Sequence, residues 1–172
     1  MALGLADRMQ IFEMQPEHIQ SVRMIEQLTG LTPWSAEDYL HASKDPKRWA
    51  GWVIVPGEAG PGIEPVGFAL LAVMPPESEL GKLAVHPDWQ RCGIASALLK
   101  KALDHALARN CHDCLLEVRS RNEGAIAFYI QHGFSKYGRR RNYYRDPLDD
   151  ALLMVRPVNQ EEAEISATYK VE

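Results

Sequence analysis

The sequence contains few cysteines and no excess of positive charge. Its 172 residues include three cysteines, and this small, odd number argues against a fold held together by disulfide bonds. The formal net charge is −4. Nucleic-acid-binding proteins carry a basic surface, so we expect no direct nucleic-acid partner.

Long apolar runs are also missing. No run reaches the roughly 20 residues that a membrane-spanning helix needs, so we expect no membrane partner. Residues 1–8 lack a basic stretch followed by an apolar core; we therefore expect no secretory signal and a cytoplasmic location. The length predicts a single domain over residues 1–172, with a core at about 9–157 and a polar tail at 158–172.

The set of metal ligands is incomplete as well. Cys111 and Cys114 have the C-x-x-C spacing, but a structural zinc ion needs about four ligands and no second pair is present. A redox-active pair normally opens a helix, whereas this pair is expected between a helix and a strand. We therefore predict two ordinary thiols and no metal ion.

Periodicity in the remaining sequence predicts seven strands and four helices. The strands are expected at 9–14, 49–55, 65–74, 79–85, 114–119, 134–141 and 150–156. The helices are expected from 16 to a cap at 30, from a cap at 35 through 40, at 94–109 and at 122–132. In the first helix, the apolar side chains expected to face inward are Ile19, Val22, Ile25 and Leu28. This order predicts an α/β fold with a mixed sheet layered by helices.

The stretch from Val85 to Ser96 joins a predicted strand to a predicted helix. The first N–H groups of a helix have no partner within it and form the positive end of its dipole, so they can bind phosphate oxygens. Gly93 has no side chain, which lets a ligand approach the backbone closely. An ordinary strand–turn–helix junction is the alternative reading.

The pattern Gln90-x-x-Gly93-x-Ala95 resembles the acetyl-coenzyme A (acetyl-CoA) signature of the Gcn5-related N-acetyltransferase (GNAT) family. The resemblance extends to Asn122-x-x-Ala125-x-x-Phe128-Tyr129 and to His132-Gly133-Phe134. It implies a GNAT fold, with a mixed, mostly antiparallel sheet of about seven strands, helices on both faces and a cofactor-binding cleft where strands splay apart. It also implies that acetyl-CoA contacts Leu83, Ala84, Val85, Arg91, Cys92, Gly93, Ile94, Ala95, Ser96 and Asn122.

The resemblance implies two catalytic residues, Glu117 and Tyr129. An α-amine has a pKa of about 7.7–8.0, so it must lose a proton in order to attack a thioester. Glu117 is implied to be the general base that takes this proton, and Tyr129 the general acid that protonates the coenzyme A thiolate. Without the resemblance, the sequence predicts that Glu117 is a solvent-facing side chain, Tyr129 a core side chain and Asn122 a helix cap.

The acceptor is implied by further residues. One branch of the GNAT family acetylates the N-terminal alanine of a small-subunit ribosomal protein. Its members resemble this sequence at Pro33-Trp34-Ser35 and in the run from Arg139 to Tyr144. Trp34 and Tyr143 are then expected to bind this protein N-terminus, or else to pack in the core. Lys82 departs from the branch, which usually has a smaller polar residue there.

Three alternatives to this reaction stay open. In the first, the acceptor is a small-molecule amine or a lysine side chain. In the second, the chain is a non-catalytic acetyl-CoA-binding module. In a third alternative Cys92 is a nucleophile with His86 as its base.

Overall fold

The computed structural model describes residues 9–57 and 62–159. Residues 1–8, part of the predicted loop after Pro56, and all but two residues of the predicted tail lie outside these ranges. The strands are β1 (Met9–Glu13), β2 (Trp49–Pro56), β3 (Gly67–Met74), β4 (Glu77–Val85), β5 (Asp113–Arg119), β6 (Ser135–Arg145) and β7 (Leu148–Pro157). The helices are α1 (Ile19–Thr29), α2 (Ala36–Ser43), α3 (Ile94–Ala108) and α4 (Glu123–Gln131), with short 3-10 turns at Pro16–His18 and Pro87–Trp89.

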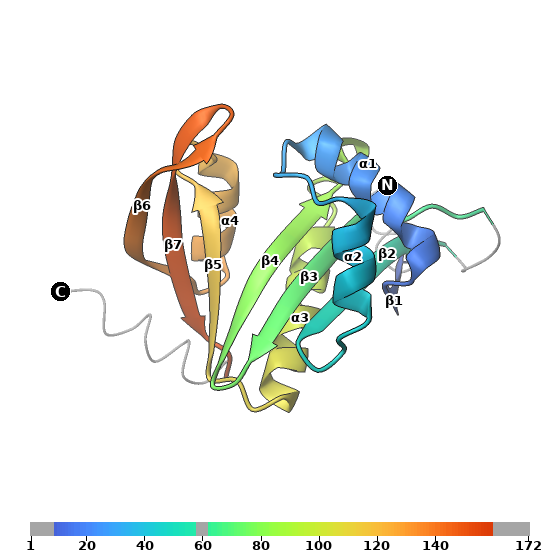
Figure 1. Cartoon of the computed structure of the whole chain (residues 1–172), viewed down its shortest axis with the longest axis horizontal. Coiled ribbons are helices and arrows are strands. Elements are labelled where there is room, and N and C mark those ends of the chain that lie inside the picture. The colour runs from blue at the N-terminus through green and yellow to red at the C-terminus, as the bar shows by residue number, and fades with distance from the viewer. Residues whose placement is uncertain (1–8, 58–61, 160–172) are drawn as a thin grey trace. The chain divides into compact units, whose positions relative to one another are not determined.

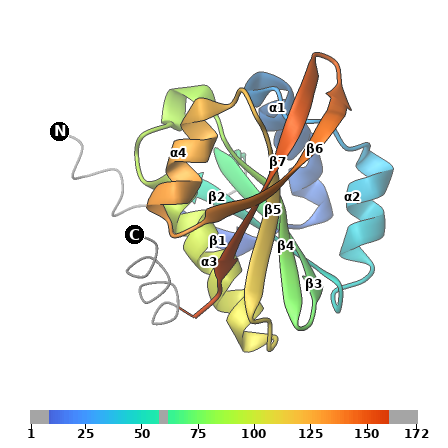
Figure 2. The ribbon, with the colours of Figure 1, turned by 90° about the vertical axis from the view of Figure 1, so that its left-hand side faces the viewer.

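The strands form one sheet in the order β1-β2-β3-β4-β5-β7-β6 (Figure 1, Figure 2). The β1–β2, β2–β3, β5–β7 and β6–β7 pairs are antiparallel, whereas β4 and β5 are parallel. The parallel pairing joins Glu77–Glu79 to Asp113–Leu115. The prediction of a mixed, mostly antiparallel sheet is confirmed.

The described chain divides into two compact units. The first contains the chain up to Val73 together with Gly81–Ala102, and the second contains Met74–Leu80 together with the chain from Leu103. The expectation of a single acetyltransferase domain stays a prediction.

In the first unit, the sheet is covered on both faces. Phe68 and Leu70 of β3 pack in a buried cluster with Val22 and Ile25 of α1. On the opposite face, a side chain at Gly67 would come within 3.0 Å of Ile94, at the start of α3. Because successive strand residues point to opposite faces, the almost continuously apolar β3 serves both layers.

The inward face of α1 differs from the predicted one at its last turn. Leu28 is 49% exposed, whereas Glu26 is fully buried. At 3.6 residues per turn, position 26 lies about 20° from Ile19 around the helix, but position 28 lies about 180° away. The helix therefore directs a carboxylate, not a leucine, into the protein.

Caps limit α1 and α2 as predicted. Gly30 closes α1 in the left-handed conformation, with φ of 69°. The Ser35 hydroxyl accepts a hydrogen bond from the Asp38 N–H at 3.1 Å and so begins α2. These two caps leave a short loop, residues 30–35, which we call the α1–α2 loop.

In the second unit, β5 alternates as predicted. Leu116 and Val118 are buried, while Glu117 lies on the other, partly exposed face. The ladder between β6 and β7 shifts register between Arg140 and Tyr144. Asn142 has a positive φ of 52° within this irregular stretch, which re-aims the side chains that follow it.

Candidate active site

The turn between β4 and α3 is closed by its own hydrogen bonds in the first unit. The N–H of His86 donates to the carbonyl of Val66 at 2.8 Å. The Gln90 side chain donates back to the carbonyl of Val85 at 3.1 Å. These bonds tie the turn to the residue before β3 and to the last residue of β4.

The second half of this turn presents open backbone. Arg91 and Gly93 have positive φ values of 63° and 79°, and a side chain built at Gly93 would meet nothing within 4 Å. Ile94 is 2% exposed and anchors the first turn of α3, where the Ala97 N–H donates to the Gly93 carbonyl at 3.0 Å. An exposed glycine before a helix N-terminus is the arrangement that binds phosphate oxygens.

Other residues predicted to contact acetyl-CoA lie beside this turn. In β4, Ala84 and Val85 are buried and Leu83 is half-buried, so these residues offer backbone groups more readily than side chains. Ala95 and Ser96 are half-buried in the first turn of α3.

Cys92 is exposed within the same turn, and its sulfur lies 3.5 Å from the Gln90 carbonyl. The expected base partner for a nucleophilic Cys92 is otherwise engaged: His86 Nδ1 accepts the Asp88 N–H at 3.2 Å. The geometry therefore gives no support to a cysteine nucleophile.

In the second unit, Glu117 lies at the centre of a cluster of charged and phenolic groups. Arg140 Nη1 is 3.2 Å from Glu117 Oε1. Hydrogen bonding to this carboxylate is the main cause that raises the pKa of Tyr143. Burial, and then the charge of Glu117, raises the pKa of Tyr144 to about 12. The cluster thus joins two residues predicted for the site, Glu117 and Tyr143.

A second carboxylate belongs to this cluster. Burial, and then the negative charge of Glu117, raises the pKa of Glu79 in β4. The register pairs Glu79 with Leu115, two residues before Glu117, so both carboxylates stand on one face of the sheet. The sequence prediction included Arg140 in the run near the acceptor but did not pair it with Glu117, and it did not single out Glu79, because only the pairing of distant strands identifies both as neighbours of Glu117.

Tyr129 and Asn122 lie on and beside α4. Tyr129 is 8% exposed, packs edge-on against Phe128 and Phe134, and has a pKa that burial raises well above the ordinary value. Its phenol therefore keeps its proton. The Asn122 side chain accepts the Ala125 N–H at 3.1 Å and caps the helix, so the capping role is confirmed while the cofactor contact stays a prediction.

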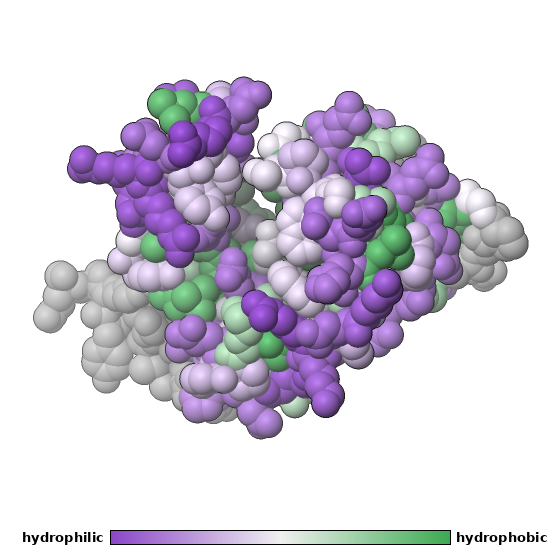
Figure 3. All heavy atoms as spheres, in the orientation of Figure 1, coloured by the Kyte–Doolittle hydropathy of each residue, from purple (hydrophilic) through white to green (hydrophobic). Residues whose placement is uncertain are grey.

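The two aromatic residues predicted to bind the acceptor differ in burial. In the first unit, Trp34 is half-buried and packs against Trp49 and Tyr39, with ring centroids 5.3 and 5.4 Å apart. In the second unit, Tyr143 is 46% exposed on the β6–β7 hairpin, whose visible surface is mostly hydrophilic (Figure 3).

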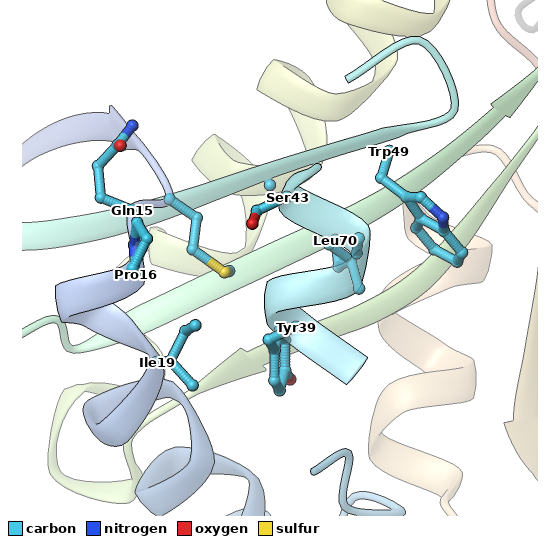
Figure 4. A pocket seen from close by; sticks show the side chains of 10 residues that line it. Gln15, Pro16, Ile19, Tyr39, Ser43, Trp49 and Leu70 are labelled. Carbon is cyan, nitrogen blue, oxygen red and sulfur yellow. The ribbon is translucent and has the colours of Figure 1, made fainter. Parts of the chain in front are cut away.

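A small cavity beneath α2 is not a substrate site. It measures about 40 Å³ and its lining includes Ile19, Tyr39 and Leu70 (Figure 4). Such a volume holds a few water molecules at most, so neither acetyl-CoA nor a peptide fits it.

Potential metal ligands do not cluster in the described part of the chain. Cys111 and Cys114 are free and buried, and burial raises the pKa of Cys114 to about 11. Residues 9–57 and 62–159 hold no group of three or more potential metal ligands. Within the same ranges, no helix is long and apolar enough to span a membrane.

Comparisons with known proteins show similarity to acetyltransferases. A family model described as the acetyltransferase (GNAT) family matches residues 14–134. The [ribosomal protein bS18]-alanine N-acetyltransferase of Escherichia coli K12 is 34% identical over 137 residues, which are 78% of this chain and 88% of that protein.

Solved structures share the fold. A crystal structure of the E. coli ribosomal-protein-S18-alanine N-acetyltransferase has a TM-score of 0.74 at 32% identity, covering 88% of this chain and 95% of that one. Arabidopsis thaliana NAA60 in complex with acetyl-CoA has a TM-score of 0.77 at 16% identity, covering 88% and 99%. These matches confirm the predicted fold class.

Proposed function

The chain belongs to the acetyltransferase (GNAT) family, and we propose that it transfers the acetyl group of acetyl-CoA to the N-terminal α-amine of a protein. The acceptor that its relatives favour is the N-terminal alanine of a small-subunit ribosomal protein, because the E. coli relative is named for that reaction. Within the chain, the proposal depends chiefly on Glu117, a partly exposed carboxylate held between Arg140 and Tyr143.

We propose that the donor binds along β4 and at the start of α3. The diphosphate would meet backbone N–H groups from Arg91 to Ser96, where Gly93 leaves open space. The pantetheine arm would lie along Leu83–Val85 like an added strand, and a backbone N–H of that stretch would stabilise the carbonyl oxygen during the reaction. Asn122 is proposed as a further contact. The splayed cleft implied by the sequence stays a prediction.

Glu117 would begin the reaction as general base. The protonated α-amine gives its proton to this carboxylate, directly or through water, and the nitrogen then attacks the thioester carbonyl carbon. The guanidinium of Arg140, whose Nη1 lies 3.2 Å from Glu117 Oε1, helps to orient this carboxylate.

Tyr129 would complete the reaction as general acid. As the C–S bond breaks, the electron pair leaves with the sulfur of coenzyme A, and the phenol supplies the proton that the thiolate takes up. Burial keeps the pKa of Tyr129 high, so the hydroxyl is protonated at neutral pH and remains a proton donor throughout the working range.

Mass spectrometry tests the proposed acceptor. The enzyme is incubated with acetyl-CoA and a peptide that has an N-terminal alanine and an internal lysine. We expect one added acetyl group, located at the N-terminus by fragmentation. Acetylation of the lysine, or of small amines only, would show that the acceptor is not a protein N-terminus. Binding of acetyl-CoA without any turnover would show that the chain is a non-catalytic module. The cytoplasmic location and the lack of nucleic-acid and membrane partners stay predictions.

A further inference from the structure

A buried ion pair joins β4 to the α1–α2 loop within the first unit. Lys82 Nζ lies 2.5 Å from Glu26 Oε1, and the side chains are 6% and 0% exposed. Lys82 also donates to the carbonyl of Thr32 at 2.6 Å, and the N–H of Trp34 lies 3.4 Å from both carboxylate oxygens of Glu26. Two buried charges therefore bond to the backbone of one short loop at two points.

The same network fixes the ring of Trp34. The ammonium group of Lys82 lies 5.2 Å from the ring centroid, a cation–π distance. The ring also packs on Trp49 and Tyr39, and Arg23 donates to the Trp34 carbonyl at 3.2 Å. Backbone and side chain of Trp34 are thus held from several sides.

Stability alone gives no reason for this arrangement. Removing two charges from water is costly, and apolar side chains of similar volume often replace a buried ion pair without loss of stability. What an apolar pair could not do is bond to the Thr32 carbonyl and the Trp34 N–H. The polar pair therefore determines where the loop lies relative to β4.

We propose that Lys82 and Glu26 are positioning residues that hold the α1–α2 loop, and with it Trp34, in a fixed place for the acceptor N-terminus. The inference rests on the proposed function, in which the residues following Lys82 hold the donor, and on the expectation from the sequence that Trp34 binds the acceptor. A fixed Trp34 limits the size of the first acceptor residue. Lys82 therefore contributes to the preference for alanine without touching either substrate.

The test uses the double variant E26L/K82M, in which an apolar pair replaces both charges. Its peptide KM should rise at least about tenfold, because both charged partners of the loop backbone are lost, while kcat and the Kd for acetyl-CoA stay unchanged. The ratio of kcat/KM for alanine-first over leucine-first peptides should fall. A purely structural pair would leave both quantities as in the wild type.

The matched control is Leu71→Ala. Leu71 is fully buried on the face of β3 opposite to Phe68 and Leu70, so its truncation weakens the same unit without removing a bond to the loop. Its peptide KM and alanine preference should equal those of the wild type. An equal rise in peptide KM in L71A and E26L/K82M would overturn the inference, as would an unchanged KM in E26L/K82M.

Hydrogen exchange separates this inference from the proposed function. Amide exchange at Trp34 should accelerate in E26L/K82M and not in L71A, whatever the acceptor is. Failure of the wild-type enzyme to acetylate any protein N-terminus would end the proposed function, and this exchange result would still decide whether the pair positions the loop. Unchanged Trp34 exchange in the double variant would overturn the positioning role even in an active enzyme.

Discussion

Two carboxylate–cation pairs of this protein, Glu26–Lys82 and Glu117–Arg140, differ in how far water reaches them. The Glu26–Lys82 pair in the first unit is 0% and 6% exposed, whereas the Glu117–Arg140 pair in the second is 20% and 56% exposed. The first pair bonds to the loop backbone, and the second lies among tyrosines and a further carboxylate.

This difference separates two uses of charge. A buried, or dry, pair cannot lose one partner without leaving an uncompensated charge inside the protein, so it suits a fixed arrangement. A pair that water reaches can separate and exchange protons at little cost, so it suits catalysis.

The largest effect is expected at the half-exposed pair. Glu117→Gln removes the proposed base, and the acetylation rate should fall by about 10²–10⁴, with little change in the free energy of unfolding. Single-turnover rates and urea unfolding measure the two quantities. Arg119→Gln is a control on the same strand, and a wild-type rate in the Glu117→Gln protein would remove this residue from the mechanism.

Breaking the buried Glu26–Lys82 pair should instead change the free energy of unfolding. Lys82→Met leaves the buried Glu26 carboxylate without its cation, so the free energy of unfolding should fall by about 3–5 kcal/mol. The double variant E26L/K82M should regain most of this loss. Urea unfolding of the three proteins measures it, and equal stability of the single variant and the wild type would contradict the view that the pair is dry and coupled.

Loss of the proposed acid should have a smaller effect. Tyr129→Phe keeps the ring packing against Phe134 but removes the hydroxyl, and turnover should fall by roughly 10². Phe128→Leu, one residue away on α4, serves as a packing control. The acid role fails if the Tyr129→Phe enzyme keeps the wild-type turnover at neutral pH.

Breaking the half-exposed pair should barely affect stability. Arg140→Met removes the cation beside Glu117, and the free energy of unfolding should change by about 1 kcal/mol or less. The measurement is urea unfolding beside Lys82→Met in the same buffer. A loss as large as that of Lys82→Met would show that the two pairs do not differ as described.

The smallest effect is a change with pH at Glu79. The folded-state pKa of this carboxyl lies above its ordinary value, so folding disfavours its charged form once the pH exceeds the unfolded pKa. Glu79→Gln should therefore stabilise the protein at neutral pH, and the gain should vanish as the pH falls below about 4, the ordinary glutamate pKa. Thermal unfolding across pH measures it; a gain at low pH only would reverse the sign.

Much of the fold was predictable from local patterns. Each of the seven predicted strands is present, because alternation and apolar runs report directly on burial. The caps at Gly30 and Ser35 and the open turn at Gly93 were predictable for the same reason, since each depends on the chemistry of a few adjacent residues.

The charged surroundings of the site were not predictable in this way. Arg140 reaches Glu117 across β7, and Glu79 joins it through the parallel register of β4 and β5. Both depend on pairing between distant segments. The spacing in α1 predicted Leu28 inside, yet the protein buries Glu26 because Lys82 of β4 neutralises it there.

Local sequence is sufficient to specify the strands and helices, the alternation that presents Glu117, and the glycine turn that opens α3, since these follow from backbone sterics and side-chain periodicity along the chain. Which charges meet depends on the folded chain, because an ion pair forms between side chains that sheet pairing brings together. The distinction between a dry pair at Lys82 and a wet pair at Glu117 therefore belongs to the folded protein alone.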